Sequence, residues 1–473
     1  RAAVMLDLSR PLVIPELAGL GLALKAGDLT RHILVTGGSG AGKSLSVVIP
    51  VLRAMLQWRR DEDAGRPALL VIDPKRELGE VVAAYAPDVV RLDEASTPAV
   101  DLFGAVNRSD LDAGTVVDRW LAISGSDWSS SRDPFWRVAA RSLFVDLVGL
   151  DLALAAKGRD AADGQLCRAS FWRALSHELR SRTLVTDAEQ RALLRMRAPI
   201  SRYLTLLRLL PRSPNDGENS SAVRATEVLT RCVASYAADV TIPSVSKLSQ
   251  MASETSMSIV ATAVAIAGPL ADGVVQARIC FDAVPPSRAR PRLDMRTAIR
   301  SGAVLLYQPR DGGEESACIS RALKAAWYDA VLQGAALGAN GQPERLALLV
   351  ADEFQRAITS VGVSDAQYVD RARALGGGCL FATQSTSALR ERLPENADHA
   401  LRALLNNVGL RIVMASTDPA LPREIESVVP APPPGFPHLV HARPPALFEP
   451  GEALWVRPGG YGLGRAVLKR PYC

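Results

Sequence analysis

One segment of the sequence matches the phosphate-binding pattern GxxxxGK[ST] at every fixed position, and it reads Gly37, Gly38, Ser39, Gly40, Ala41, Gly42, Lys43, Ser44. Glycines let backbone N–H groups turn toward phosphate oxygens, and the amino end of a following helix adds a positive dipole. In this pattern Lys43 reaches the β and γ phosphates, and the Ser44 hydroxyl ligates Mg²⁺. Residues 37–44 therefore predict a site for ATP and Mg²⁺.

A pair of acids follows an apolar run much later in the chain. The run Leu346–Ala351 ends in Asp352 and Glu353. A buried strand that ends in two acids brings them to the carboxyl edge of a parallel sheet, which is also where a phosphate loop lies. We therefore expect Asp352 to hold the Mg²⁺ shell and Glu353 to polarise the attacking water.

Polar residues beside two other apolar runs are further site candidates. Gln384 follows the run at 379–382, where its amide is suited to sense a γ phosphate or to orient water. Arg371 and Arg373 precede that run, and Arg373 is the better candidate for an arginine finger that acts on a neighbouring subunit's nucleotide. The alternatives are a polar strand end for Gln384 and a solvated helix surface for the arginines.

The loop after the run at 68–72 is less specific. Asp73 and Lys75 lie in it and belong to the same edge of the predicted sheet. They either couple the nucleotide state to a neighbour or substrate, or form a structural loop.

These residues need a scaffold of short buried strands. Apolar runs without polar alternation predict strands buried on both faces, and they occupy 32–36, 68–72, 303–307, 346–351, 379–382 and 411–414. Helical spacing lies between several of them, at 44–57 with a kink at Pro50, at 319–333 and at 366–375. This alternation predicts an α/β fold with a mostly parallel sheet flanked by helices. A late pair of runs, 453–456 and 465–468, straddles a Pro-Gly-Gly turn and predicts an edge hairpin.

The middle of the chain differs from both ends. It is rich in Ala, Leu, Arg and Ser at helical spacing, which predicts an all-α insertion. We therefore expect the nucleotide-binding domain in two parts, residues 1–108 and 294–473, around an inserted helical domain at 109–293.

Composition excludes several classes of protein. With 48% hydrophobic and 22% charged residues the chain is not disordered overall. Six cysteines without a CxxC pair and five histidines without HExxH argue against a disulfide scaffold and a zinc site, and His438 and His441 are expected to face solvent. Cys280 and Cys379 are expected in the core. The longest apolar stretch, at 259–270, is shorter than the roughly 20 residues that a membrane span needs.

Charge is concentrated in one segment. Residues 165–213 contain ten arginines and three acids, a local charge of +7 against +5 for the whole chain. Such a patch favours contact with nucleic-acid phosphates. A solvated helical face and a docking surface for a protein substrate remain the alternatives.

Together these motifs resemble the type IV coupling proteins of conjugation and type IV secretion, within the FtsK/HerA-like group of RecA-type motors. The resemblance covers nearly the whole chain and rests on GGSGAGKS (37–44), VIDPKRE (71–77), DPFW (133–136), LLVADEF (348–354), ATQS (382–385) and the stretch from Phe448. It implies a RecA-like fold with an inserted all-α domain, and the roles given above for Lys43, Ser44, Asp352, Glu353 and Gln384. Arg373 stands eleven residues before Gln384, where this family tends to keep an arginine. One departure is Arg76, where the family usually has glycine.

The resemblance also implies a function. On this resemblance we expect the chain to belong to a hexameric ATPase. The ATPase would drive DNA, single-stranded or relaxase-bound, into a type IV secretion channel at the cytoplasmic face of the bacterial inner membrane. Its partners are then the secretion components, and a membrane segment absent from this chain, upstream of Arg1, is expected to anchor it. Two alternatives remain: a soluble FtsK/HerA-like ATPase of DNA processing or defence, and a nucleotide-gated scaffold that recruits secreted proteins.

Overall fold

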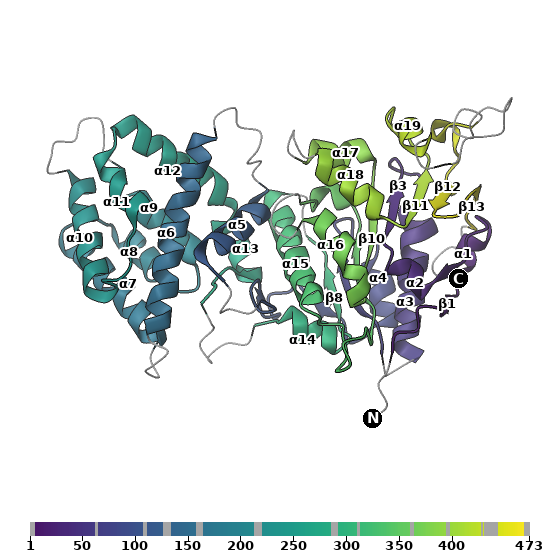
Figure 1. Ribbon diagram of the computed structural model, residues 1–473, viewed down its shortest axis with the longest axis horizontal. Coiled ribbons are helices and arrows are strands. Elements are labelled where there is room, and N and C mark those ends of the chain that lie inside the picture. Colours follow the sequence, from purple (N-terminus) through teal and green to yellow (C-terminus); the bar gives the residue numbers. More distant parts are fainter. Residues whose placement is uncertain are drawn as a thin grey trace. The chain divides into compact units, whose positions relative to one another are not determined.

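The computed structural model describes most of the chain, namely residues 5–61, 65–106, 111–125, 134–157, 164–211, 220–284, 292–309, 313–359, 364–393, 398–426, 429 and 443–467. His438 and His441 lie outside the described residues, as does Arg212. The chain forms two compact units, one of Arg1–Thr97 with Asp294–Cys473 and the other of Pro98–Leu293 (Figure 1).

In the part of the chain that the structure describes, a sheet of nine strands is the centre of the first unit. Its order is β13-β12-β11-β3-β10-β9-β4-β8-β5, and all neighbours are parallel except those that involve β12. The strands are β3 (Ile33–Thr36), β4 (Ala68–Ile72), β5 (Val90–Arg91), β8 (Val304–Tyr307), β9 (Ala347–Ala351), β10 (Gly377–Thr383), β11 (Leu410–Met414), β12 (Glu452–Arg457) and β13 (Gly460–Arg465). Every residue of β3, β4, β8, β9 and β10 is buried, which confirms the prediction for their apolar runs. The run at 411–414 also forms a strand, β11, but its Arg411 is only partly buried.

Helices cover both faces of this sheet. Leu380 and Ala382 of β10 belong to the core that also holds the apolar side of α3. On the opposite face, a Cβ at Gly377 would lie within 2.8 Å of side-chain atoms from α15 and α16. The helices of this unit are α1 (Pro15–Ala18), α2 (Ala26–Leu29), α3 (Ile49–Asp61), α4 (Gly79–Tyr85), α14 (Met295–Arg300), α15 (Glu314–Leu332), α16 (Asp365–Arg371), α17 (Thr386–Glu391), α18 (Asp398–Asn407) and α19 (Leu421–Glu426), beside a small pair of strands, β1 (Pro11–Leu12) and β2 (Leu24–Lys25).

The helix predicted after the glycine-rich segment forms, but its first turn is wide. Residues Ser44–Val48 are wound as a π-helix, in which the N–H of Ile49 donates to the carbonyl of Ser44, and α3 follows. Pro50 lacks an N–H and so cannot donate to Ser46 four residues earlier, which favours an altered turn at this point.

The late hairpin is antiparallel and lies at the edge of the sheet, as predicted, but its second strand begins earlier. The prediction placed that strand at 465–468, whereas β13 is Gly460–Arg465. Gly459 has a φ of +85°, so the chain reverses in two residues and Arg457 pairs directly with Gly460. The two-residue turn therefore sets the register of β13 against β12, and the apolar side chains at 465–468 do not.

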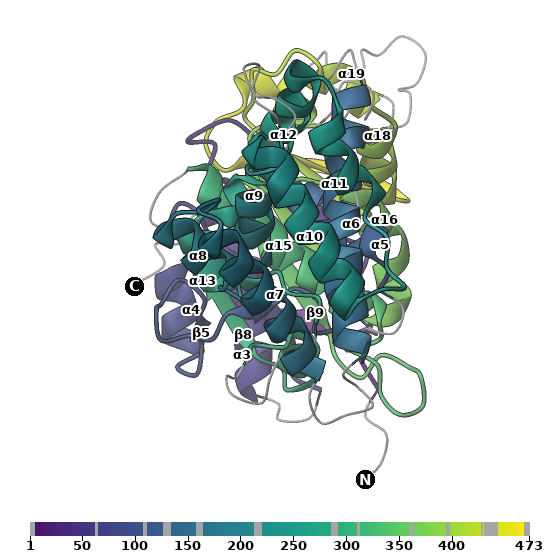
Figure 2. The same cartoon turned by 90° about the vertical axis from the view of Figure 1, so that its left-hand side faces the viewer.

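The second unit is mainly helical. Its elements are β6 (Val100–Asp101), α5 (Ala113–Ser124), α6 (Phe135–Lys157), α7 (Gly164–Ser181), α8 (Asp187–Leu193), α9 (Pro199–Leu207), α10 (Ser221–Tyr236), α11 (Pro243–Lys247), α12 (Ser253–Ala267), α13 (Gly273–Arg278) and β7 (Ile279–Cys280), which pairs in parallel with β6. The long helix α6 packs against α5, α7, α11 and α12 (Figure 2). Among the described residues, none of the helices combines the length and the apolar composition that crossing a bilayer requires.

A buried charge network lies inside this helical unit. Asp151 pairs with Arg168 and Arg202, and it accepts hydrogen bonds from Trp172 (2.7 Å) and from the hydroxyl of Tyr203 (2.6 Å). Burial alone would raise the pKa of Asp151, but the two guanidinium charges keep it below its ordinary value. Two of the ten arginines that predicted a phosphate-binding patch are therefore internal, because they neutralise a buried carboxylate.

Cys280 and Cys379 are buried, as expected for core positions. All the described cysteines are free thiols.

Candidate active site

The strand order brings the predicted site residues to one edge of the sheet. β3, β10, β9 and β4 are consecutive neighbours and parallel, so their carboxyl ends coincide. The glycine-rich segment follows β3, Gln384 follows β10, the acid pair follows β9, and Asp73 and Lys75 follow β4. Four segments that are far apart in sequence thus meet around one point.

The glycine-rich segment has the backbone of a phosphate loop. Gly40 and Gly42 have φ values of +77° and +93°, which residues other than glycine rarely adopt. A Cβ added to Gly37 would lie 2.9 Å from the Cβ of Met414, so glycine is also required there by close packing. The N–H of Ser46 donates to the carbonyl of Gly42 at 2.8 Å, which joins the loop to the following helix.

Lys43 lies inside this loop and is only 4% exposed. Its Nζ donates to the carbonyl oxygens of Gly37 (2.6 Å) and Gly38 (3.1 Å). Burial and the nearby charge of Lys75 lower the pKa of Lys43, while the charges of Glu353 and Asp352 act in the opposite direction. The lysine and the acid pair are therefore within electrostatic reach of each other.

Asp352 is a buried carboxylate with one oxygen left over. Its Oδ1 accepts the N–H of Glu353 at 3.0 Å, while Oδ2 has no partner among the described residues. Burial raises the pKa of Asp352 to about 6. An uncompensated buried oxygen, together with the hydroxyl of Ser44 at the loop, fits a Mg²⁺ ion that completes its shell with phosphates and water. Within the described ranges no cluster of three His, Cys, Asp or Glu side chains offers a protein-only metal cage.

Glu353 is held by three other side chains of the site. It is 3% exposed, and its backbone is left-handed at φ +48°. Oε1 pairs with Nζ of Lys75, and Oε2 accepts the side-chain amides of Gln384 (3.0 Å) and Gln355. Burial alone would raise the pKa of Glu353, but these hydrogen bonds and the Lys75 charge hold it below its ordinary value.

Sequence reasoning missed one member of this network, Gln355, and gave another, Lys75, a different role. Gln355 is 8% exposed, and its Oε1 accepts the hydroxyl of Thr383 at 2.9 Å while its amide contacts Glu353. No spacing in the sequence marked Gln355, since its partner Thr383 belongs to the neighbouring strand β10. Lys75 was singled out for a different task, and only the structure brings it to Glu353.

Comparison with known proteins assigns the chain to a family. The family model described as "Type IV secretory system Conjugative DNA transfer" matches residues 11–282, which is more than half of the chain. The chain belongs to this family. No curated protein matches the sequence.

Solved structures of the plasmid coupling protein TrwB have the same fold as this chain. The TrwBdeltaN70 form with sulphate has a TM-score of 0.54 and 16% identity, over 98% of this chain and 91% of that chain. TrwB with ADP and Mg²⁺ has a TM-score of 0.53 and 16% identity, over 95% and 88%. TrwB with the ATP analogue ADPNP has the same score and identity, over 96% and 89%. The predicted RecA-like, mostly parallel α/β fold is thereby confirmed.

Arg76 lies in the loop after β4, at the position where the sequence resemblance led us to expect glycine. Arg76 has a φ of +62°, and its guanidinium donates to the carbonyls of Pro309 (3.1 Å) and Gln308. Asp73 is fully buried and accepts the N–H of Leu78 and the amide of Gln308, both at 2.8 Å. Burial raises the pKa of Asp73. Asp73 therefore fixes the loop that carries Lys75, and its role in coupling to a substrate stays a prediction.

Arg373 lies away from the other site residues of its own chain. It is exposed, and it belongs to the 3₁₀ turn Ala372–Leu375 directly before β10. The seven residues of β10 separate it from Gln384, so it lies toward the opposite edge of the sheet. The structure does not bring it to the acid pair, and any action on a nucleotide would have to be on that of a neighbouring subunit.

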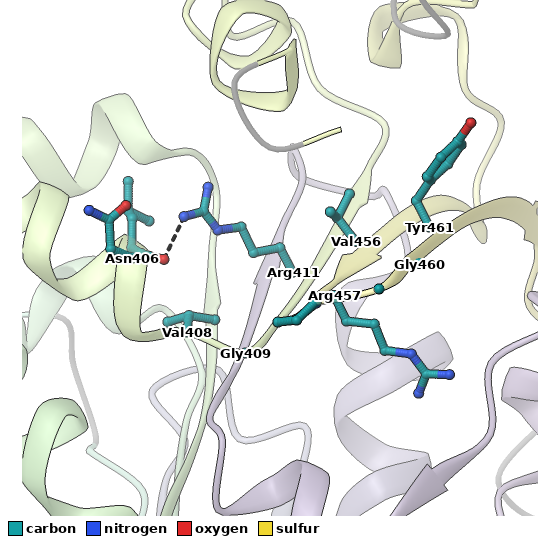
Figure 3. A pocket seen from close by; sticks show the side chains of 11 residues that line it. Asn406, Val408, Gly409, Arg411, Val456, Arg457, Gly460 and Tyr461 are labelled. Carbon is teal, nitrogen blue, oxygen red and sulfur yellow. Dashed lines mark hydrogen bonds between the residues drawn. The ribbon is translucent and has the colours of Figure 1, made fainter. Parts of the chain in front are cut away.

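A separate pocket of about 530 Å³ also lies at that opposite edge (Figure 3). It is formed by the end of α18, the start of β11 and the β12–β13 hairpin, and Arg411 inside it donates to the last turn of α18 at the carbonyl of Leu405. Because β11 and β3 both begin here, the pocket lies a full strand length from Lys43 and is not part of the phosphate site.

Proposed function

We propose that this chain is the motor part of a Mg²⁺–ATP-dependent coupling protein, which uses ATP hydrolysis to move DNA or a nucleoprotein into a type IV secretion channel. Family membership supports the process, and the TrwB structures with ADP and Mg²⁺ and with an ATP analogue support the ligands. The active form is a homohexameric ring at the cytoplasmic face of the inner membrane. Its substrate is single-stranded or relaxase-bound DNA, and a membrane segment absent from this chain anchors it beside the secretion components.

The observation that carries this proposal is the convergence of Lys43, Asp352, Glu353 and Gln384 at neighbouring strand ends. Residues 37–44 surround the phosphates, and Lys43 exchanges the carbonyls of Gly37 and Gly38 for the β and γ phosphate oxygens. Ser44 and Asp352 would hold Mg²⁺, which would neutralise charge that develops on the phosphates.

Glu353 acts as the base in this mechanism. It accepts the proton of the attacking water, and Gln384, which is itself exposed, keeps the carboxylate oriented and contacts the γ phosphate or the water. Arg373 completes the site of the adjacent subunit, where its charge stabilises the transition state. Its exposure at the opposite sheet edge supports action between subunits.

The helical unit supplies the DNA contact in this proposal. Exposed arginines of the segment are Arg173, Arg180, Arg182, Arg191, Arg195, Arg197 and Arg208. The three acids of the segment are all engaged: Glu178 with Arg231, Asp187 with Arg180, and Glu189 as a helix cap. Within the described ranges the other six arginines pair with no carboxylate, so their charge is available to phosphates.

ATP turnover tests the enzymatic part. Lys43→Ala and Glu353→Gln should each abolish hydrolysis in the oligomeric protein, whereas Glu315→Gln, an exposed acid of α15, should keep the wild-type rate. Undiminished turnover in either site variant would defeat the proposal.

DNA stimulation tests the motor part. The triple variant Arg191→Gln/Arg195→Gln/Arg197→Gln should keep basal turnover and lose DNA stimulation, with a shallower dependence of DNA affinity on salt. Arg31→Gln/Arg392→Gln/Arg402→Gln removes the same charge from exposed positions of the first unit and should retain stimulation. Equal losses in both triples would point to net charge, and an absence of any DNA effect on the wild type would favour a role in recruiting proteins.

A further inference from the structure

Among the described residues, three donors surround the Glu353 carboxylate, and one of the three carries a charge. The amides of Gln355 and Gln384 contact Oε2, and the ammonium of Lys75 pairs with Oε1. We propose that Lys75 is a positioning residue, whose ion pair fixes the orientation of the Glu353 carboxylate at the end of β9. The inference rests on the proposed function, in which Glu353 is the base.

Burial makes a charged partner necessary. Glu353 is 3% exposed, and an isolated carboxylate out of water costs several kcal/mol unless a charge and hydrogen bonds compensate it. Amide dipoles satisfy the lone pairs of Oε2 but do not neutralise the charge. Lys75 therefore supplies the compensation that the two glutamines lack, and it does so at the oxygen that they leave open.

The loop that carries Lys75 is held independently of Lys75 itself. Asp73 caps the backbone of residues 77 and 78, and Arg76 is tied to the carbonyls of 308 and 309. The Lys75 side chain is 33% exposed and reaches the carboxylate from the solvent side. Replacing Lys75 therefore removes the positive charge beside Glu353 without opening a cavity in the core.

The two lysines of the site have different partners. Lys43 donates to carbonyls of the phosphate loop, whereas Lys75 pairs with the carboxylate of Glu353. Lys43 is therefore the phosphate ligand and Lys75 acts through Glu353. This division predicts separable kinetic effects, in which loss of Lys75 lowers kcat and leaves KM for ATP unchanged.

Steady-state kinetics test this division. Lys75→Met, which keeps most of the stem but removes the charge, should lower kcat about 10- to 100-fold, since a misplaced base loses much of its contribution. Lys75→Arg should restore most of kcat, and Lys247→Met, the same change at an exposed lysine of the helical unit, should have no effect. The inference would be overturned by an unchanged kcat in Lys75→Met. It would also be overturned by a raised kcat, which would mean that Lys75 blocks the base, or by a raised KM alone, which would mean that Lys75 binds phosphate.

A second measurement does not depend on activity. In nucleotide-free protein, Lys75→Met should lower Tm in the wild-type background but not in the Glu353→Gln background, because the amide no longer needs a charged partner. Equal Tm shifts in both backgrounds would overturn the ion-pair role. These results can be told apart from a failure of the proposed function. Full ATP turnover in Glu353→Gln would defeat the proposed function itself. An inactive Glu353→Gln together with wild-type turnover in Lys75→Met would defeat only the role of Lys75.

Discussion

The side-chain amide of Gln384 donates a 3.0 Å hydrogen bond to the carboxylate of Glu353, although 31 residues separate them in the chain. The bond exists because β10 and β9 are adjacent and parallel, so that the residues which follow them emerge side by side. Gln384 thus occupies the strand end between the phosphate loop and the acid pair, and its amide contacts the proposed base.

Removing this amide should impair chemistry more than binding. We expect Gln384→Ala to lower kcat about 100-fold, the loss typical of one preorganised donor, with little change in ATP affinity. Single-turnover hydrolysis and equilibrium binding of a fluorescent ATP analogue separate the two quantities. Gln342→Ala, an exposed glutamine before β9, is the control. A variant that loses affinity but not kcat would show that Gln384 serves binding instead.

A buried ion pair holds Ala357 and Thr359, which follow Glu353 in the chain. Nζ of Lys324 contacts both oxygens of Asp365, at 2.7 and 2.8 Å, and both side chains are 1% exposed. Lys324→Met should cost about 3–5 kcal/mol in free energy of unfolding, since it leaves a carboxylate buried without its cation. Urea denaturation measures the loss.

Two comparisons make the Lys324 prediction specific. Lys324→Met/Asp365→Leu should be more stable than Lys324→Met, because neither charge is then buried alone. The exposed pair of Lys157 and Asp239 is the reference, and Lys157→Met should cost about 1 kcal/mol or less. If the double variant proved less stable than the single one, packing rather than charge would account for the effect.

Arg373 should act between subunits. Arg373→Ala is expected to bind ATP normally and to lose hydrolysis about 1000-fold, as for arginine fingers. Mixing Arg373→Ala with Lys43→Ala protomers should recover part of the activity, because some interfaces then combine an intact loop with an intact finger. Arg371→Ala is the neighbouring control. Mixtures that stay as inactive as the separate variants would remove the finger assignment.

His32 should make the first unit sensitive to acid. Its imidazole is 1% exposed and contacts the carbonyl of Val369 at 2.9 Å, and burial lowers its pKa from 6.5 to about 4. Between these values the unfolded chain binds the proton and the folded chain does not. Stability is therefore complete above pH 6.5 and falls as the pH drops toward 4, by about 2 kcal/mol between pH 7 and pH 5.

Urea unfolding at pH 7 and pH 5 measures this loss. His32→Asn tolerates the left-handed backbone of this position (φ +65°) and should have a smaller difference between the two pH values. The exposed His177→Asn should behave as the wild type. Identical pH dependence in His32→Asn and the wild type would refute the prediction.

Local sequence patterns were sufficient for the central parallel strands of the first unit. Runs such as 68–72 and 346–351 are short and have no polar alternation, which favours strands covered on both faces, and the structure agrees. The Gly37–Ser44 pattern is equally local, because its positive φ values and its helix start are written in consecutive residues. The sequence did not show which arginines of residues 165–213 are buried. Nothing in the spacing of Arg168 and Arg202 distinguishes them from exposed neighbours, since their partner Asp151 is on another helix.

The sequence by itself determined which residues are candidates for phosphate chemistry and which strand each of them follows, because both are properties of short contiguous segments. Only the tertiary structure decided which side chains share a carboxylate. Lys75, Gln355 and Gln384 meet at Glu353 through the order of β4, β9 and β10 in the sheet. That order depends on long-range packing of helices on the sheet, and no local pattern encodes it.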